Sequence, residues 1–435
     1  MTAAIPDGPG RPERLRELGM IESAMALNHA TLRGNAQIVL AMELACTADF
    51  DLDLLRRACA AVRRRFALLR CAIEDDGTRL HFCRAGAASA AAWHVAPGAS
   101  LAAFARQVID APELDPRRSL WRVVAAPAGA PGIYYLALVL HHAIVDASGA
   151  GLVTAALLEA LDCLLEGSPP PDVRGDMLPP ALDDFLAAAP NVPPTAAPTG
   201  AHGPNPGWTP IGGRHTGFQT LELAAPVHAA LRHACRVLDV TDNALLTALY
   251  VRACVACGIV ADPVAVRSAV SLRDVLGAAA DPVALGCYIG VNTTLIESGA
   301  GSVVELARRY QRELVRSILG TSLRKRTFAV PALRAAMASA ERRDAFQPGV
   351  GITNIGRVAP AAGLRGIRLR HYLPLARRLS NANGCVLHVH SLDERLALTL
   401  VYPEPNFAPS LAGAILADLG DGLTALAQDA AKVAA

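Results

Sequence analysis

The segment from Leu140 to Gly149, which reads LHHAIVDASG, holds the residue types in this chain best suited to chemistry. An imidazole has an unperturbed pKa near neutrality, so His141 or His142 can take a proton from a hydroxyl or an amine. Asp146 can pair with a buried cation or cap a helix that follows it. Spacing alone fits equally well a pair of core histidines beside a helix N-cap.

Metal binding is disfavoured throughout the chain, and we expect no metal site. Adjacent residues at the end of a strand point to opposite faces, so the two neighbouring histidines do not converge on one ion, and no third ligand lies nearby. His388 and His390 share a strand face, with His371 as a possible third ligand, but ordinary sheet histidines explain them better. Cys254 and Cys257 have redox or zinc spacing without a second pair, which favours core packing.

Composition excludes several classes of protein. The chain has 435 residues, 52% hydrophobic and 18% charged, with a net charge of +2. This balance argues against a nucleic-acid binder and against disorder. Lys325 and Lys432 are the only lysines among 41 basic residues, so a catalytic lysine or a phosphate-binding G-x-x-x-x-G-K loop is not expected.

The expected cellular location rests on the N-terminal stretch, the cysteines and the most apolar stretch of the chain. The N-terminal stretch is charged and lacks the apolar core of an export signal. The ten cysteines are therefore expected to be reduced, in a cytoplasmic protein. The most apolar stretch, Ala244 to Ala261, is interrupted by Arg252, so we expect no membrane span.

The elements that position the histidines can be read on either side of them. A continuous apolar run over 133–140 predicts a strand buried on both faces, and a helix is predicted from about 148 to 166. The length suggests two lobes. We place the first at 1–175, a Pro-rich crossover linker at 176–216 and a second lobe at 217–435. Both lobes alternate strands and helices, and the second sheet is expected to be partly antiparallel.

The histidine segment resembles the HHxxxDG signature of the chloramphenicol-acetyltransferase-like superfamily. That superfamily includes condensation domains of nonribosomal peptide synthetases, polyketide-associated acyltransferases, plant BAHD acyltransferases and wax-ester synthases. His141, His142 and Asp146 match the signature, whereas Ala147 stands in place of its glycine and Gly149 follows two positions later. Further segments on both sides of the histidines resemble those of the family and occur in the family's order. They lie at 50–53 (FDLD) with 68–70 (LLR), 120–122 (LWR), 271–273 (SLR), 286–293 (GCYIGVNT) and 353–357 (TNIGR).

The resemblance implies an α/β fold of two chloramphenicol-acetyltransferase-like sandwich lobes in a V, with a central active-site tunnel. His142 would be the general base and His141 its structural neighbour. Asp146 would be structural and paired with Arg273, or as second choice with Arg70. Candidates for contacting the substrate or its oxyanion are Ser271, Asn292, Asn354 and Gly149.

The resemblance also implies the substrates. No bound cofactor is expected. The donor would be a phosphopantetheine-linked acyl thioester, carried in trans by an acyl or peptidyl carrier protein or by coenzyme A. A small-molecule hydroxyl or amine would attack it, giving an ester or an amide in specialised metabolism, in a protein expected to be monomeric. The alternatives are a wax-ester or lipid acyl-CoA acyltransferase, and a catalytically inactive condensation-like domain that recruits carrier proteins.

Overall fold

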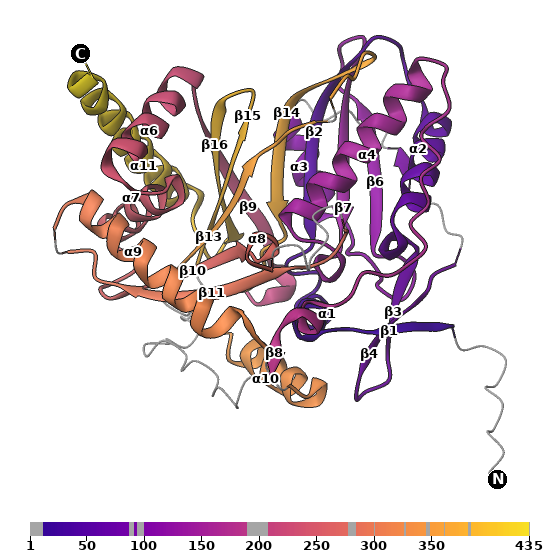
Figure 1. Ribbon diagram of the computed structural model, residues 1–435, viewed down its shortest axis with the longest axis horizontal. Coiled ribbons are helices and arrows are strands. Elements are labelled where there is room, and N and C mark those ends of the chain that lie inside the picture. Colours follow the sequence, from indigo (N-terminus) through magenta and orange to yellow (C-terminus); the bar gives the residue numbers. More distant parts are fainter. Residues whose placement is uncertain are drawn as a thin grey trace.

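The computed structural model describes residues 12–86, 91–93, 100–188, 208–276, 284–299, 301–325, 328–344, 349–360, 362–381 and 384–434. Two lobes lie side by side, and strands from each line the junction between them (Figure 1). The α/β fold predicted from the sequence, with two sandwich lobes, is confirmed. The central part of the predicted linker, 189–207, lies outside the described residues.

The first lobe is built on a five-stranded sheet. Its order is β14 (Ile367–Ala376), β2 (Ile38–Cys46), β7 (Ile133–Leu140), β6 (Trp121–Pro127) and β5 (Ala91–Trp93). Seven of the eight residues of β7 are buried, as the continuous apolar run predicts for a central strand. The strand ends at Leu140, where it pairs with Ile38 on one side and Trp121 on the other, so the histidines follow directly at the sheet's end.

Helices cover both faces of this sheet. On one face α2 (Leu52–Arg65) and α4 (Ala147–Leu165) pack over residues such as Met42 and Leu138. On the other face α3 (Leu101–Asp110) packs with its Phe104 against Tyr135. Phe218 and Val401 of the second lobe join this second cluster, so part of the first sheet's core is also the lobe interface.

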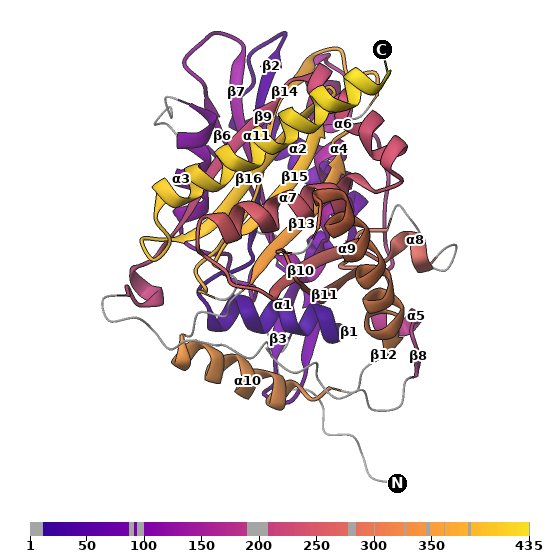
Figure 2. The same cartoon turned by 90° about the vertical axis from the view of Figure 1, so that its left-hand side faces the viewer.

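The second lobe holds a mixed six-stranded sheet, as expected. Its order is β11 (Ile289–Ile296), β10 (Val264–Ser271), β13 (Val350–Arg357), β15 (Val386–Leu392), β16 (Arg395–Glu404) and β9 (His215–Leu223). The β10–β13 and β13–β15 pairs are parallel and the others are antiparallel. The helices of this lobe pack on its outer side (Figure 2), namely α6 (Ala225–Leu238), α7 (Asp242–Ala256), α9 (Val303–Ser317) and α11 (Pro409–Ala434).

One strand corrects the predicted lobe boundary. The sequence assigned everything from 217 onward to the second lobe, but β14 pairs antiparallel with β2 along its whole length and belongs to the first sheet. Proline removes a backbone donor, which normally argues against a strand, and Pro374 lies within this one. It is tolerated because β14 is the edge strand of its sheet.

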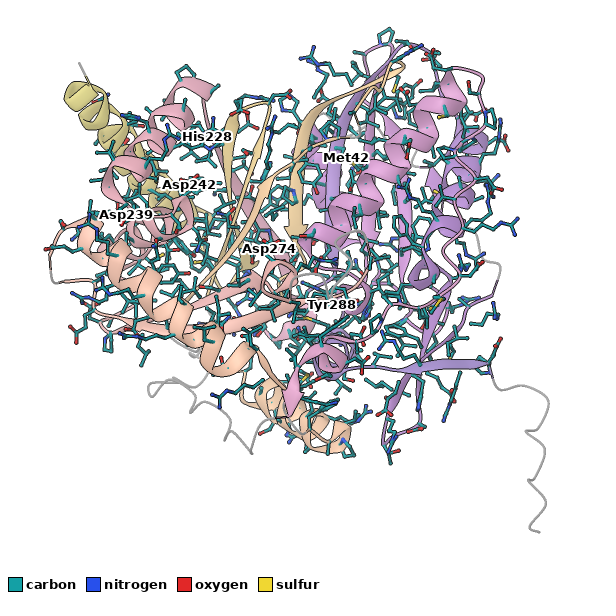
Figure 3. All side chains as sticks on the ribbon, in the orientation of Figure 1. Met42, His228, Asp239, Asp242, Asp274 and Tyr288 are labelled. Carbon is teal, nitrogen blue, oxygen red and sulfur yellow. The ribbon has the colours of Figure 1, made fainter. Side chains whose placement is uncertain are left out.

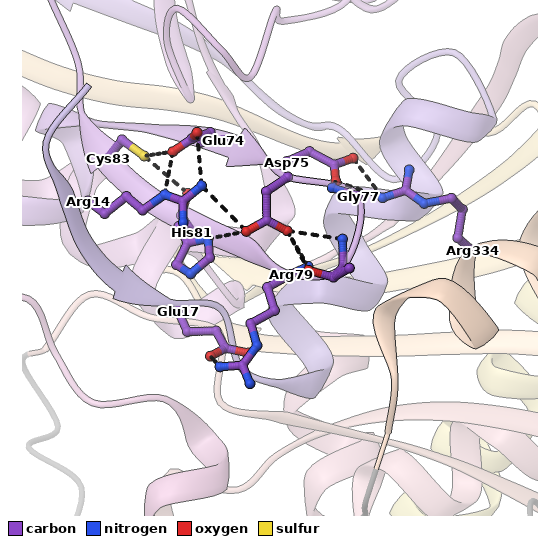
Figure 4. Close-up of polar contacts among 11 residues, drawn as sticks. Arg14, Glu17, Glu74, Asp75, Gly77, Arg79, His81, Cys83 and Arg334 are labelled. Atoms are coloured by element: carbon purple, nitrogen blue, oxygen red, sulfur yellow. Dashed lines mark hydrogen bonds and ion pairs between the residues drawn. The ribbon is translucent and has the colours of Figure 1, made fainter. Parts of the chain in front are cut away.

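A small sheet at the base of the first lobe is fastened by charged side chains. It comprises β1 (Arg14–Glu17), β4 (Leu80–Arg84) and β3 (Cys71–Asp75). Arg14 bonds to Glu74 at 2.7 Å, and Arg334 of α10 (Val330–Arg343) reaches both carboxylate oxygens of Asp75 at 2.7 and 2.8 Å (Figure 4). The last contact ties the C-terminal half of the chain to the N-terminal half.

The remaining elements are short, apart from α1 (Met20–Thr31), which packs beneath the histidine segment. Two helices, α4 and α11, are long and apolar enough to cross a membrane by length and composition alone. These features are weak evidence for a membrane span, because buried core helices share them, and α4 and α11 both contribute residues to the hydrophobic cores. The short elements are α5 (Leu182–Phe185), β8 (Ala187–Ala188), β12 (Arg324–Lys325) and α8 (Arg273–Leu276).

Candidate active site

The two histidines that follow β7 have different environments. The His141 backbone N–H bonds to the Leu120 carbonyl, and a short 3-10 turn, His142–Ile144, then leads to α4. The His141 ring is fully buried, accepts a hydrogen bond from the Ala143 N–H at Nδ1, and lies 4.5 Å from the ring of His29. His142 is only partly buried. Of the pair, therefore, only the second histidine is open to a substrate.

His142 lines a cavity of about 170 Å³ between the two lobes. The first lobe contributes apolar residues of β2 and β14 and the start of α4. The second lobe contributes two residues of β10, three of β13 and one each of β11 and β15. The polar lining residues include His142, Ser271, Thr353, Asn354, Tyr372 and His388.

Burial keeps the His142 ring neutral. It lowers the pKa of His142 below its usual value, opposed by backbone carbonyls and by the charge of Asp146. A neutral imidazole has one ring nitrogen without a hydrogen, and that nitrogen has the lone pair that a general base needs. Cys287 of the second lobe lies beside Nδ1, with Sγ 3.8 Å away, and burial raises the pKa of its thiol.

Both oxygens of the Asp146 carboxylate accept hydrogen bonds from the protein itself, so Asp146 is not placed to take a proton from a substrate. The Gly149 N–H donates to Oδ1 at 2.7 Å, and the Tyr288 N–H to Oδ2 at 3.1 Å. Arg273 adds two further bonds, Nε to Oδ2 at 3.0 Å and Nη2 to Oδ1 at 3.2 Å. This ion pair is almost completely buried, with side-chain exposures of 5% for Arg273 and 1% for Asp146. The carboxylate joins the helix that follows His142 to the second lobe.

Tyr288 completes this joint, lying where the two lobes meet (Figure 3). Its ring stacks under the Arg273 guanidinium at 4.7 Å, which stabilises a buried cation further. Gly286 is required next to it, because a Cβ there would lie 2.5 Å from the tyrosine ring. The Gly286 carbonyl in turn accepts hydrogen bonds from the Asp146 N–H and from Arg273.

Two of the substrate-contact candidates lie elsewhere. Asn292 is buried on the helix side of β11, and its Oδ1 accepts hydrogen bonds from Ser317, Thr321 and Ser322. Along β11, Ile289 faces the cavity, so the residue three positions on faces away from it. Gly149 cannot stabilise an oxyanion, because its N–H already caps α4 through Asp146.

Ser271 and Asn354, predicted candidates for contacting substrate, both border the cavity. Thr353 faces the cavity level with His388, so the side chain of Asn354, one residue on, points to the other face of the sheet, where Asn354 borders a second pocket with His228 and Val389. The Asn354 Oδ1 accepts the Gly356 N–H at 3.0 Å, so its Nδ2 is the donor end. Ala147 is the first residue of α4, where the backbone is helical and needs no glycine. Arg70 plays no part in the Asp146 pair. It bonds to the carbonyls of Arg63, Arg64 and Gly175 and lies 3.7 Å from Asp176.

His388 is the site residue that sequence reasoning missed, since it was weighed only as a zinc ligand. It lines the cavity from β15, and its Nδ1 lies 3.1 Å from the Pro374 carbonyl oxygen. Burial lowers the pKa of His388 to about 4, despite that carbonyl. Within the described ranges, no three His, Cys, Asp or Glu side chains are grouped to hold a metal ion.

Comparison with known proteins identifies the fold. No family model matches the sequence, and no curated protein matches it. Among solved structures, polyketide synthase associated protein 5 from Mycobacterium tuberculosis matches with a TM-score of 0.67 and 15% identity, over 96% of this chain and 100% of that one. The trichothecene 15-O-acetyltransferase TRI3 from Fusarium sporotrichioides matches with a TM-score of 0.72 and 12% identity, over 94% and 95%.

A third match is the first condensation domain of the calcium-dependent antibiotic synthetase, with a TM-score of 0.65 and 14% identity, over 96% of this chain and 97% of that one. These structures share their fold with this chain over nearly its whole length. The chain therefore has the two-lobed chloramphenicol-acetyltransferase-like fold of acyltransferases and condensation domains.

Proposed function

We propose that this chain is an acyltransferase of the condensation type, which transfers an acyl group from a phosphopantetheine-linked thioester to a hydroxyl or an amine in specialised metabolism. The observation that carries the proposal is the neutral, partly exposed ring of His142 on the wall of a cavity built by both lobes. The fold shared with an acetyltransferase and with a condensation domain supports it. The donor is a carrier protein or coenzyme A thioester, and it is a substrate rather than a resident cofactor.

The reaction needs positioning and one proton acceptor, because a thioester is already activated. Nε2 of His142 takes the proton from the nucleophile as its oxygen or nitrogen bonds to the thioester carbon. The C–S bond then breaks, and the departing sulfur receives that proton from the His142 imidazolium. The products are an ester or amide and a free thiol. Alignment of the two substrates between the lobes lowers the barrier further.

The oxyanion of the tetrahedral intermediate needs donors on the cavity wall. The hydroxyls of Ser271 and Thr353, on the cavity face of the second lobe, can supply them. Asp146 acts at a distance, since its bonds to Arg273 and the Tyr288 N–H hold the second lobe against the start of α4. It is a positioning residue in this scheme.

The test is release of free thiol from acyl-coenzyme A and from acyl-loaded carrier protein, offered with a panel of small amines and alcohols. The acylated product is identified by mass. His142→Ala should lower the rate by roughly 10²–10⁴-fold at unchanged thermal stability. His371→Ala is the matched control, because that ring is 39% exposed on β14 and does not line the cavity.

Other outcomes separate the alternatives. Long-chain alcohols as the only productive acceptors would assign the chain to the wax-ester type. Binding of carrier protein without thiol release would make it a non-catalytic recruiter. Wild-type rates in His142→Ala would exclude the mechanism itself.

A further inference from the structure

The cavity contains a second imidazole, from the lobe opposite His142. His388 lies on β15, level with Thr353 of β13 and Thr399 of β16 in the ladder, and is 6% exposed. Both His388 and Thr353 line the cavity. A hydrogen bond links His388 across the lobe junction to the Pro374 carbonyl on β14, so the ring is held in one orientation.

That hydrogen bond fixes the tautomer of His388. A carbonyl oxygen can only accept, so Nδ1 of His388 carries the hydrogen and donates to Pro374. Nε2 is left with a lone pair and no hydrogen. Burial, which lowers the pKa of this histidine to about 4, keeps the ring in this neutral form at physiological pH. Burial lowers the pKa of His142 as well, so its neutral ring also offers one acceptor nitrogen. The cavity thus presents two imidazole acceptors, one from each lobe.

The neighbouring histidine on the same strand face shows that this arrangement is specific to His388. His390 lies two residues further along β15, is 2% exposed, and packs edge-on against the Tyr372 ring with centroids 5.5 Å apart. It hydrogen-bonds to the Tyr372 backbone carbonyl and does not line this cavity. His390 is therefore a structural histidine in a similar setting, and serves as a matched control.

The first-lobe wall of the cavity is largely apolar, whereas Thr353 lies beside His388 on the second lobe. Ile38 and Leu40 of β2 and Pro374, Leu375 and Ala376 of β14 line the same cavity. An acceptor in such surroundings favours a ligand that supplies a donor, because an unpaired polar group away from water is costly. A site built to bond a donor rejects analogues that lack it. One donor hydrogen of the nucleophile goes to His142, so His388 requires a second.

We propose that His388 selects nucleophiles bearing a second hydrogen-bond donor at or next to the attacking atom, the class that comprises primary amines and vicinal diols. The inference rests on the proposed acyl transfer and names the substrate class for it. The attacking N–H or O–H points to His142, and the second N–H or O–H donates to Nε2 of His388. His388 takes no proton, so the stoichiometry of the transfer is unchanged.

Two matched pairs of nucleophiles test this, a primary amine against its N-methyl analogue and a 1,2-diol against the 1-alcohol of equal length. The relative kcat/KM within each pair is measured from thiol release. The wild type should favour the two-donor member of at least one pair by about tenfold or more, and the responding pair distinguishes an amine from a diol substrate. His388→Leu should reduce the preference to about twofold or less. His388→Gln, which retains an acceptor oxygen, should keep much of it, and His390→Leu should leave it unchanged.

Three results would overturn the inference. These are no preference in the wild type, a preference that survives in His388→Leu, or an equal loss for both members of a pair. Equilibrium binding of the same four nucleophiles, followed by calorimetry, keeps the test independent of turnover. If the wild type transfers no acyl group, the proposed function fails. The two-donor preference in binding, and its loss in His388→Leu, then decide the role of His388.

Discussion

The two lobes contribute to the cavity in different ways. The first lobe provides His142 and Asp146 from a single short segment, where a buried strand ends and a helix begins. The second lobe provides Ser271, Thr353 and His388, one residue each from three separate strands. A change in the first segment therefore affects several functions at once, whereas each residue of the second lobe can be altered singly. The buried Asp146–Arg273 ion pair joins the two contributions.

Breaking that joint should have the largest effect on stability. Asp146→Ala leaves Arg273 buried without its counter-charge, a change that typically costs about 3–5 kcal/mol. Denaturant unfolding measures it, together with the Asp146→Ala/Arg273→Ala double variant. Glu17→Ala, which removes an exposed ion pair with Arg79, should shift the midpoint little. Wild-type stability in Asp146→Ala would mean that the pair does not hold the lobes together.

The wall of the second lobe can be tested by removing its hydroxyl donors. Ser271→Ala or Thr353→Val should lower kcat by roughly 10²–10³-fold where the lost hydroxyl contacts the oxyanion, with little change in KM. Asn354→Ala, on the other face of β13, is the control and should leave kcat unchanged. Full activity in both hydroxyl variants would mean that the second lobe supplies no oxyanion donor from these strands.

The pH dependence separates the base from the structural histidines. Because burial lowers the pKa of His142, its base form persists below pH 6.5, and kcat/KM should decline only as the pH falls through that lowered pKa. An acid limb centred at or above 6.5 would contradict this.

The free energy of unfolding should also fall as the pH is lowered, because burial lowers the pKa of two further histidines. Burial lowers the pKa of both His388 and His390 to about 4, against 6.5 for an unshifted histidine. Between these values the unfolded chain binds more protons than the native protein, so unfolding becomes easier as the pH falls from 6.5 to 4. Urea midpoints of the wild type and His390→Leu over this range measure the contribution of that ring.

The smallest effect is expected away from the cavity, at Asn292. Asn292→Ala removes the shared acceptor of three hydroxyl groups that join β11 to the end of α9 and the residues after it. We expect a loss of about 1–3 kcal/mol in unfolding free energy, with unchanged kcat. A large fall in kcat would place this amide in the site after all.

The sequence predicted the β7 strand and the helix after the histidines from local periodicity. The roles of His142 and of the Asp146–Arg273 pair came from the family resemblance, and the structure contains that buried pair. Asn292 was misplaced because a strand's two faces differ by one residue in register, and the partner strand sets which face is buried. His388 acquires its role from the Pro374 carbonyl, on a strand that the sequence did not predict.

The missed elements share a physical reason. β14 combines Pro374 with alternating arginines, and its partner β2 lies more than 300 positions earlier in the chain. α1 has buried Glu22, Ser23 and His29 on its inner side, so it lacks the apolar stripe that marks a helix. In both cases tertiary contacts override the local pattern.

β14 comes from the C-terminal half of the sequence but belongs to the sheet of the first lobe, and this limits how the chain can be cut into fragments. The outer edge of β2 is covered by β14, and a chain ended before residue 367 would leave that row of backbone donors and acceptors bare. Such a fragment is prone to self-association, so the halves are not autonomous folding units. A design that removes or replaces either half of the chain must keep residues 367–376 together with the N-terminal half.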